Sequence, residues 1–198
     1  YKYPDHELIP MVMSRLGDYF QKKGQQFKDR AKPLREKVDE LSVAEVLRLD
    51  GLSYPEFLNA AMVFTKLLTR FPDDPLAGLA GIRSGQNFMR ALQYEKAIDV
   101  FQDIIDNEEF DGGKIRAQAL FWGAYSRELY PTSEDDYRTR GTMIREAYQM
   151  YRRITFDFPD SIWAKRARGR LADPVFERII EQENEARERL IENIKSMR

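Results

Sequence analysis

The sequence predicts an all-α fold built from repeated helical units. A small residue, an aromatic residue four positions later and a proline eight positions after that recur along the chain, at Ala60-Phe64-Pro72, at Ala147-Tyr151-Pro159 and, without the proline, at Ala97-Phe101. A glycine also lies thirteen residues after a proline at Gly17 and Gly85, and thirteen residues after Phe110 at Gly123. Units that recur in this way bury their apolar faces against their neighbours, so we expect one continuous array.

These residues resemble the tetratricopeptide repeat, a pair of antiparallel helices with small residues where the helices cross and a proline that closes the second helix. Gly85 and Ala97 keep the twelve-residue distance between the small residues of the two helices, and we expect them to face each other. The closing Phe-Pro-Asp at residues 71–73 and 158–160 is similar to the variant of bacterial cell-envelope proteins, such as the Tol-Pal-associated periplasmic repeat protein and the outer-membrane barrel assembly lipoprotein. The resemblance covers most of the chain and implies a right-handed α-solenoid of antiparallel helix pairs with a C-terminal capping helix.

The first unit has helical periodicity over about residues 5–24, from Leu8, Val12, Leu16, Tyr19 and Phe20. Its second helix is expected to begin at Ser53, because Ser53, Pro55 and Glu56 fit an N-cap, a first-turn proline and a glutamate at N3. The small residues Gly17 and Ala60 are then much farther apart than twelve residues. We therefore expect an insertion at residues 25–52 that carries its own helix between Pro33 and Leu49, with Ser42 as a cap.

The later units are more regular. Helices are expected over about residues 74–92, 94–107 and 114–130, with the Asp111-Gly112-Gly113 break before the third. A second insertion at residues 131–143 is expected as a solvated loop or an extension of the next helix, with Ser133 and Asp136 placed like a capping box. After Pro159 one helix should reach Leu171. A last one, from Asp173 to Met197, should cap the array through a stripe of Phe176, Ile179, Ala186, Leu190, Ile194 and Met197.

The units together predict a single domain over residues 1–198, with repeats at about 5–73, 74–110 and 111–160 and a terminal helix pair at 160–198. Tyr3-Pro4-Asp5 has the form of the closing motif of a unit, so the sequence looks like a fragment of a longer chain. A signal peptide, a lipid anchor or further repeats would then lie upstream.

Composition excludes several function classes. The 198 residues include 32 Lys plus Arg and 33 Asp plus Glu, for a net charge of −1, so the chain has no basic field for a nucleic acid. It has no cysteine, which excludes disulfides and thiolate chemistry but leaves the compartment open. No apolar run approaches the roughly 20 residues that span a bilayer. From the resemblance we expect a periplasmic or outer-membrane-associated protein, with the cytoplasm as the alternative.

The search for catalytic chemistry gives no constellation of residues. The single histidine, His6, has no cysteine and no second histidine in the sequence with which to build a metal site or a nucleophile–base pair. The run from Asn107 matches the first positions of a calcium loop, but Gln118 stands where the bidentate glutamate belongs. Trp122 and Trp163 fall at helix-pairing positions, where core packing is the expected role. We therefore expect no enzyme activity, no metal and no cofactor.

The remaining prediction concerns the surface. First helices of stacked pairs line a concave face, so partner contacts are expected from positions around the packing glycines. We predict a groove for a protein or peptide partner lined by Gln86, Met89, Arg90, Arg127 and Glu128, with Arg90 and Arg127 addressing one acidic segment. Further positions expected on this face are Ser14, Asp18, Gln21, Lys22, Ile82, Leu120 and Ala124.

The sequence thus predicts a non-catalytic protein–protein interaction scaffold, for assembly or maintenance of the bacterial envelope. The alternative is a docking or regulatory repeat region of a larger enzyme or transport complex.

Overall fold

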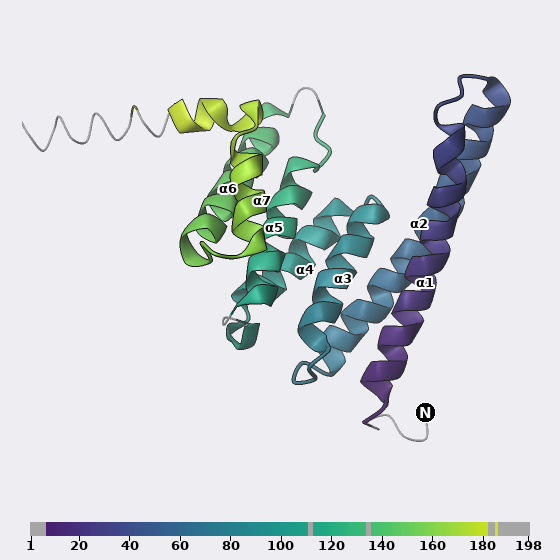
Figure 1. The fold of residues 1–198 in the computed structure, drawn as a ribbon, viewed down its shortest axis with the longest axis horizontal. Coiled ribbons are helices and arrows are strands. Elements are labelled where there is room, and N and C mark those ends of the chain that lie inside the picture. The colour runs from purple at the N-terminus through teal and green to yellow at the C-terminus, as the bar shows by residue number, and fades with distance from the viewer. Residues whose placement is uncertain (1–6, 111–112, 134–135, 182–184, 186–198) are drawn as a thin grey trace, which may run out of the picture.

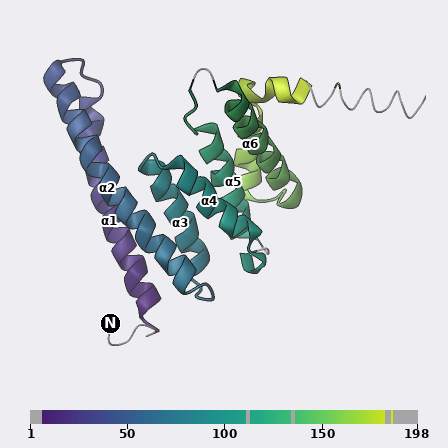
Figure 2. The same cartoon turned by 180° about the vertical axis from the view of Figure 1, so that it is seen from behind.

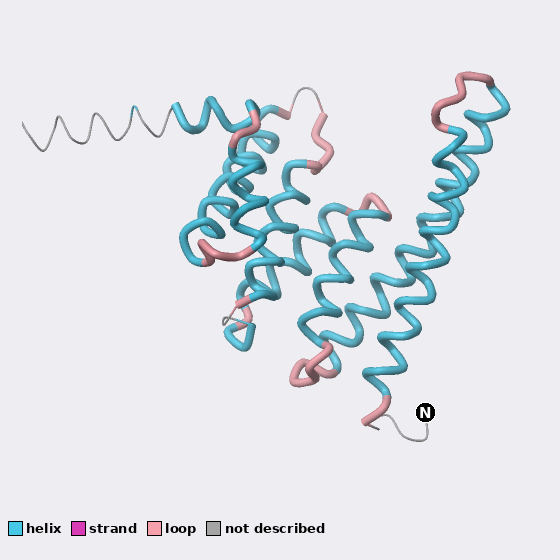
Figure 3. Tube along the Cα trace, in the orientation of Figure 1, coloured by secondary structure: helices cyan, strands magenta, loops and turns pink. Residues whose placement is uncertain are grey.

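The computed structural model describes residues 7–110, 113–133, 136–181 and 185, and among these it is helical with no strand. The expected all-α class is confirmed. The α-helices are α1 (Ile9–Ala31), α2 (Glu40–Arg70), α3 (Ala77–Arg90), α4 (Tyr94–Asp106), α5 (Lys114–Glu128), α6 (Tyr137–Asp157) and α7 (Ile162–Leu171). Short 3-10 turns are η1 (Lys32–Leu34), η2 (Glu108–Phe110) and η3 (Pro174–Phe176), and loops are confined to the helix ends (Figure 3).

Consecutive helices pack against one another along the chain. Each of α1 to α6 contacts the helix that follows it. Two further contacts skip one helix: α3 contacts α5, and α5 contacts α7. The result is a row of helices, with α1 and α2 at one end and α6 and α7 at the other (Figures 1 and 2). This order of contacts is typical of an array in which every unit covers its neighbour.

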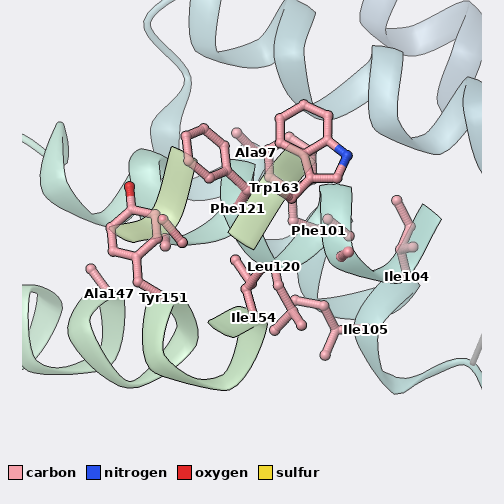
Figure 4. Close-up of a cluster of buried hydrophobic side chains, with 14 of the residues drawn as sticks. Ala97, Phe101, Ile104, Ile105, Leu120, Phe121, Ala147, Tyr151, Ile154 and Trp163 are labelled. Carbon is pink, nitrogen blue, oxygen red and sulfur yellow. The ribbon is translucent and has the colours of Figure 1, made fainter. Parts of the chain in front are cut away.

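The main core runs from α2 to η3 and contains the aromatic residues of the repeat (Figure 4). Phe101 and Tyr151 are completely buried there with their small partners Ala97 and Ala147, and Ala60 and Phe64 are completely buried in a second cluster between α2 and α3. Trp163 belongs to the main core and Trp122 packs against it, which confirms the packing role expected for both. The recurring residues are therefore the ones that hold neighbouring helices together.

Glycines allow aromatic rings to lie directly on a neighbouring helix. A Cβ atom at Gly85 would be 2.4 Å from the ring of Phe101, and one at Gly17 would be 2.6 Å from the ring of Phe64. Ala97 was expected to face Gly85. The residue whose ring lies against Gly85 is instead Phe101, one helical turn after Ala97. At the start of α5, Gly113 has a φ of 154°, a conformation that glycine adopts far more readily than other residues.

The first helix pair differs from the prediction. α1 continues to Ala31, and α2 begins at Glu40 after Asp39, whose carboxylate accepts a hydrogen bond from the Ser42 N–H at 2.9 Å. The expected start at Ser53 is wrong, because Ser53 and Pro55 lie inside α2. Residues 25–52 therefore form no separate helix; they lengthen both members of the pair.

Contacts along this pair show why α2 is continuous. Gly17 lies against Phe64 and Gly24 against Phe57, so α1 and α2 run in opposite directions. Farther along, Lys23 pairs with Glu56 at 2.7 Å, while Asp50 accepts from Lys28 at 3.0 Å and from Arg35 at 2.7 Å. The ion pairs lie on both sides of Pro55, at Asp50 before it and at Glu56 after it. The Ser53 hydroxyl also donates to the Asp50 carbonyl at 2.7 Å. These contacts keep α2 helical across the proline.

The second insertion divides between a loop and a helix. α6 begins at Tyr137 and its N-cap is Asp136, whose carboxylate accepts from the Thr139 N–H at 3.1 Å, rather than Ser133. α7 begins after Ser161, which caps it, and Phe176 in η3 is completely buried. Helical residues then continue to 181. The expected stripe from Ala186 onward, like His6 and the motif at residues 3–5, lies outside the described residues.

Candidate partner-binding surface

A cavity of about 270 Å³ opens between α3 and α5, close to the start of α4. Three of the five predicted residues, Gln86, Met89 and Arg90, line it from α3. The opposite wall carries residues that the sequence analysis missed: Trp122, Tyr125 and Leu129 from the α5 segment and Tyr94 from α4. Most of this lining is apolar, with the Gln86 amide and the Arg90 guanidinium at its edge.

The aromatic wall is held in place by ring contacts. Trp122 and Tyr125 meet edge to face with ring centroids 6.0 Å apart, and the Arg170 guanidinium lies 5.7 Å from the Tyr125 ring. Partial burial, with Tyr125 and Tyr54 nearby, raises the pKa of Tyr94, so its hydroxyl stays protonated and can donate a hydrogen bond at neutral pH. The wall thus offers flat apolar surface with a few polar tips.

Arg90 is the cation of the cavity. Its guanidinium lies 5.6 Å from the Phe57 ring centroid of α2 while part of the side chain reaches solvent. Burial lowers the pKa of Arg90, although it remains charged at neutral pH. Within the described part of the chain no carboxylate pairs with it. An exposed guanidinium that lies against an aromatic ring, with no carboxylate paired to it in the described residues, favours a ligand that brings a carboxylate or carbonyl oxygen.

Arg127 does not belong to this surface. It is 8% exposed, pairs with Glu146 of α6 at 2.8 Å and donates to the Gly123 carbonyl and to Gln102 of α4 at 3.3 Å each. It lines a different cavity, between α4, α5 and α6. The prediction that Arg90 and Arg127 address one segment is therefore corrected, since the α5 surface that carries Arg127 packs toward α4 and α6.

Glu128 also has a structural position. It is 8% exposed, accepts a hydrogen bond from the Tyr151 hydroxyl and pairs with Arg170 of α7. Burial and the neighbouring Glu128 raise the pKa of Tyr151, and the hydrogen bond that Arg170 donates to the Glu128 carboxylate raises the pKa of Arg170. This cluster connects α5, α6 and α7, so Glu128 is not free to meet a partner.

Other positions expected on the concave face are also occupied by packing. Ile82, Leu120 and Ala124 are at most 1% exposed. Asp18 pairs with Arg83 at 2.7 Å and Gln21 accepts from Asn87 at 2.9 Å, which fixes α1 to α3. The sequence contained a sign of the aromatic wall. When Gly85 is aligned with Gly123, the large aromatic residues Trp122 and Tyr125 take the positions of the smaller polar residues Ser84 and Asn87 of α3.

The described residues contain no group of three or more histidine, aspartate or glutamate side chains that could hold a metal ion. None of the helices in those residues is both long enough and apolar enough to cross a membrane. Comparison with known proteins gives no match to any family model, curated protein or solved structure. Function must therefore be inferred from the repeat pattern and from the geometry of this cavity.

Proposed function

We propose that the protein is a non-catalytic protein–protein interaction scaffold, a right-handed solenoid of antiparallel, tetratricopeptide-like helix pairs that binds a partner segment at the cavity between α3 and α5. The observation that carries this proposal is the position of Arg90, which has no carboxylate partner in the described residues, beside the aromatic wall of Trp122 and Tyr125. The repeat spacing and the packing of each helix on the next support the solenoid.

The cavity suits one side chain of a protein partner. Small-molecule sites commonly measure about 300–1,000 Å³, and this cavity, at about 270 Å³, is smaller and open to solvent. An aliphatic or aromatic side chain would lie against Met89, Trp122 and Leu129, and an acidic group next to it in the partner would reach Arg90. Tryptophan, tyrosine and arginine are the residues that most often dominate binding energy at protein interfaces.

The bacterial cell envelope is the proposed location, in the periplasm or at the outer membrane. The Phe-Pro-Asp closure at residues 71–73 and 158–160 supports this through its likeness to envelope repeat proteins. Fractionation of the source cells tests it, and recovery of the protein with cytoplasmic markers alone would reject this location.

A photo-cross-linking amino acid at position 86 tests the binding role directly. In source cells it should give one discrete adduct with another protein, because Gln86 lines the cavity. Arg90→Glu should remove that adduct by placing a like charge where the partner's acidic group belongs. Arg145→Glu, the same change at an exposed position of α6, is the matched control and should leave the adduct unchanged. No adduct from position 86, or an adduct that persists with Arg90→Glu, would reject the cavity as the binding site.

A further inference from the structure

The outward side of α6 carries a stripe of arginines. Arg138, Arg145 and Arg152 are exposed and stand seven residues apart, so they follow one side of the helix at intervals of about 10.5 Å. We call these three residues the arginine stripe. The Arg152 guanidinium lies 5.7 Å from the Tyr148 ring centroid, and Phe156, which is 86% exposed, follows at the end of the stripe. With five arginines and two acidic residues, α6 has a net charge of +3.

The outward side of α4 carries the opposite charge. Asp99, Asp103 and Asp106 are exposed on one side of the helix, with Glu95 one turn before them, and we call these four residues the acidic stripe. Lys96 is the one basic residue of α4, whose net charge is −3. Burial and the neighbouring carboxylates of Asp99 and Asp106 raise the pKa of Asp103. The acidic stripe is thus crowded with like charge and would attract a cation placed against it.

Both helices carry charges that oppose the helix dipole. A helix is stabilised by acidic residues in its first turn and by basic residues in its last turn. Asp103 and Asp106 are in the last turn of α4, and Arg138 and Arg140 are in the first turn of α6. In the acidic stripe Glu95 alone has the favourable position, in the first turn of α4. Stability of the separate helices therefore does not account for the two stripes, whereas contact with opposite charge does.

The two stripes border the same face of the molecule. α4, α5 and α6 follow one another along the row of helices (Figure 2), and Arg127 of α5 donates to Gln102 of α4 while it pairs with Glu146 of α6. A cavity of about 390 Å³ lies between these three helices, with Gln102 and Gln149 in its lining. Gln102 donates to the Asp106 carboxylate at 3.0 Å, and Gln149 stands within about one turn of two of the arginines. An acidic stripe and a basic stripe thus flank one cavity.

We propose that this face binds the same face of a second copy of the chain, so that the acidic stripe of each copy meets the arginine stripe of the other. Asp99 and Asp106 are seven residues apart, as are Arg145 and Arg152, so two ion pairs can form in register at each contact. Because one face carries both stripes, a single two-fold axis forms both contacts at once. Such a dimer is closed and grows no further.

The dimer is expected to be weak and sensitive to salt. Exposed ion pairs individually contribute little, and salt screens them. The exposed ring of Phe156 adds apolar area beside the arginines. The residues of the two stripes take no part in lining the cavity between α3 and α5, so the dimer would present two such cavities to partners.

Sedimentation velocity at two salt concentrations tests this dimer. The wild-type chain should be dimeric at an ionic strength of about 0.01 M and monomeric at about 1 M, where screening is nearly complete. Arg145→Glu with Arg152→Glu should abolish the dimer at low salt, and so should Asp99→Lys with Asp106→Lys. Circular dichroism of each variant checks that its helices remain folded.

A control variant separates the stripes from net charge. Lys22→Glu with Lys66→Glu changes the net charge by the same amount as the double arginine variant, at exposed positions of α1 and α2. It should form a dimer like the wild type. Loss of the dimer in this control, or a dimer that persists in either variant with a reversed stripe, would overturn the inference.

Mixing the two variants with reversed stripes tests the pairing itself. One chain then has acidic groups in both stripes and the other has basic groups in both, so each contact again joins opposite charges. The mixture should form a one-to-one heterodimer at low salt, although neither chain associates alone. The control variant mixed with the double lysine variant should form no heterodimer, because one of its two contacts would join like charges. A reversed-stripe mixture that contains only monomers would overturn the inference.

The dimer and the partner cavity can be tested separately. Arg90→Glu should remove the adduct from position 86 and leave the dimer intact, whereas the double arginine variant should lose the dimer and keep the adduct. A wild-type chain that stays monomeric at low salt would overturn the inference. If that monomer bound vesicles of anionic lipid through Arg145 and Arg152, the arginine stripe would instead belong to a membrane-binding surface.

Discussion

At the scale of the residue, the distance between helices depends on glycines that face aromatic rings. Gly85 leaves no room for a side chain, since the Phe101 ring occupies the place of its Cβ. Gly51 lies inside α2, yet a Cβ there would meet no atom within 4 Å. The two glycines therefore have opposite roles although both lie inside helices. Gly85 permits packing, and Gly51 only adds backbone freedom to the unfolded chain.

These two positions predict opposite effects of one substitution. Gly85→Ala should lower the free energy of unfolding by about 1–3 kcal/mol, because the new methyl group would displace a buried ring. Gly51→Ala should raise it by about 0.5–1 kcal/mol through better helix propensity. Urea denaturation followed by circular dichroism measures both. Equal effects at the two sites would contradict the packing described for Gly85 and Phe101.

Leu92 has an unusual backbone conformation for its residue type. It follows α3 with a φ of 59°, in the left-handed region that glycine prefers, and the Gln93 N–H after it donates to the Phe88 carbonyl at 2.9 Å. This is the geometry of a helix end that usually has glycine at this position. The Leu92 side chain is 52% exposed, so it contributes little burial in return.

Replacing Leu92 with glycine should therefore stabilise the protein. We expect Leu92→Gly to raise the free energy of unfolding by about 0.5–1 kcal/mol, because a non-glycine residue in this region costs about 1–2 kcal/mol. Thermal unfolding would show a higher midpoint. Leu129→Gly, at another helix end but with a negative φ of −87°, is the control and should not stabilise. A lower midpoint for Leu92→Gly would contradict the strain assigned to this residue.

At the scale of the element, the helices from α3 onward could be predicted closely, and the first pair could not. The ends of α3, α4 and α5 and the end of α7 lie within about three residues of the predicted ones, so local signals were nearly sufficient there, although the cap of α6 is Asp136 and not Ser133. At Ser53 and Pro55 the same local signals indicated a helix start, but ion pairs and ring contacts with α1 override them. Such contacts join residues about 22 to 33 positions apart, beyond the reach of a local pattern.

The candidate site shows the same limit. Three of the five predicted residues line the cavity, because the register of α3 follows from Gly85. Arg127 and Glu128 were expected on the concave face because of their distance from the packing glycine Gly123, but Glu146, Tyr151 and Arg170 from later helices pair with them instead. A charged residue that is buried and paired cannot be distinguished from an exposed one until its partners are known.

Asp50 ties the far end of the α1–α2 pair together, and this predicts a local effect. Burial alone would raise the pKa of Asp50, but hydrogen bonds from Lys28 and Arg35 outweigh it, so the pKa lies below its usual 3.8. Asp50→Ala should therefore speed hydrogen exchange of backbone amides near residues 28–50 and leave those of α4 and α5 unchanged. Glu45→Ala, which removes only a pair with Arg48 inside α2, is the control.

The same carboxylate predicts a pH effect of known sign. A group with a lowered folded pKa adds stability above its unfolded pKa, and this contribution disappears as the pH falls through the folded value. The protection factors of amides near residues 28–50, which correct for the intrinsic pH dependence of exchange, should thus fall in the wild type below about pH 3.8. The Asp50→Ala variant should lack this additional acid sensitivity. A wild-type profile identical to that of the variant would show that Asp50 does not hold the pair.

At the scale of the whole molecule, stability is expected to be divided along the row of helices. Trp163 belongs to the main core around α5 and α7 and Trp122 packs against that core, whereas Phe57 is buried between α1 and α2. Because each helix contacts mainly its neighbours, the first pair can lose structure while the later helices keep theirs. Tryptophan fluorescence reports on the later helices, and circular dichroism reports on all of them.

Phe57→Ala should separate these two signals. Loss of this ring should destabilise the first pair by about 3–5 kcal/mol. The urea transition seen by circular dichroism should then begin at lower concentration, while the fluorescence midpoint stays the same. Ile154→Ala, at a completely buried position of the main core, should instead shift the fluorescence midpoint. If Phe57→Ala moved both signals together, the array would unfold as one unit.

The unequal lengths of the helices give the molecule a lever. α2 has 31 residues and α3 has 14, so they measure about 46 Å and 21 Å, and the end near η1 projects past the body (Figure 1). With an arm of about 25 Å, a rotation of about 10° at the contact between α2 and α3 would move that end by about 4 Å. A small change in the contact between Ser84 and Thr65 would therefore move a partner bound near η1 by about the length of a side chain.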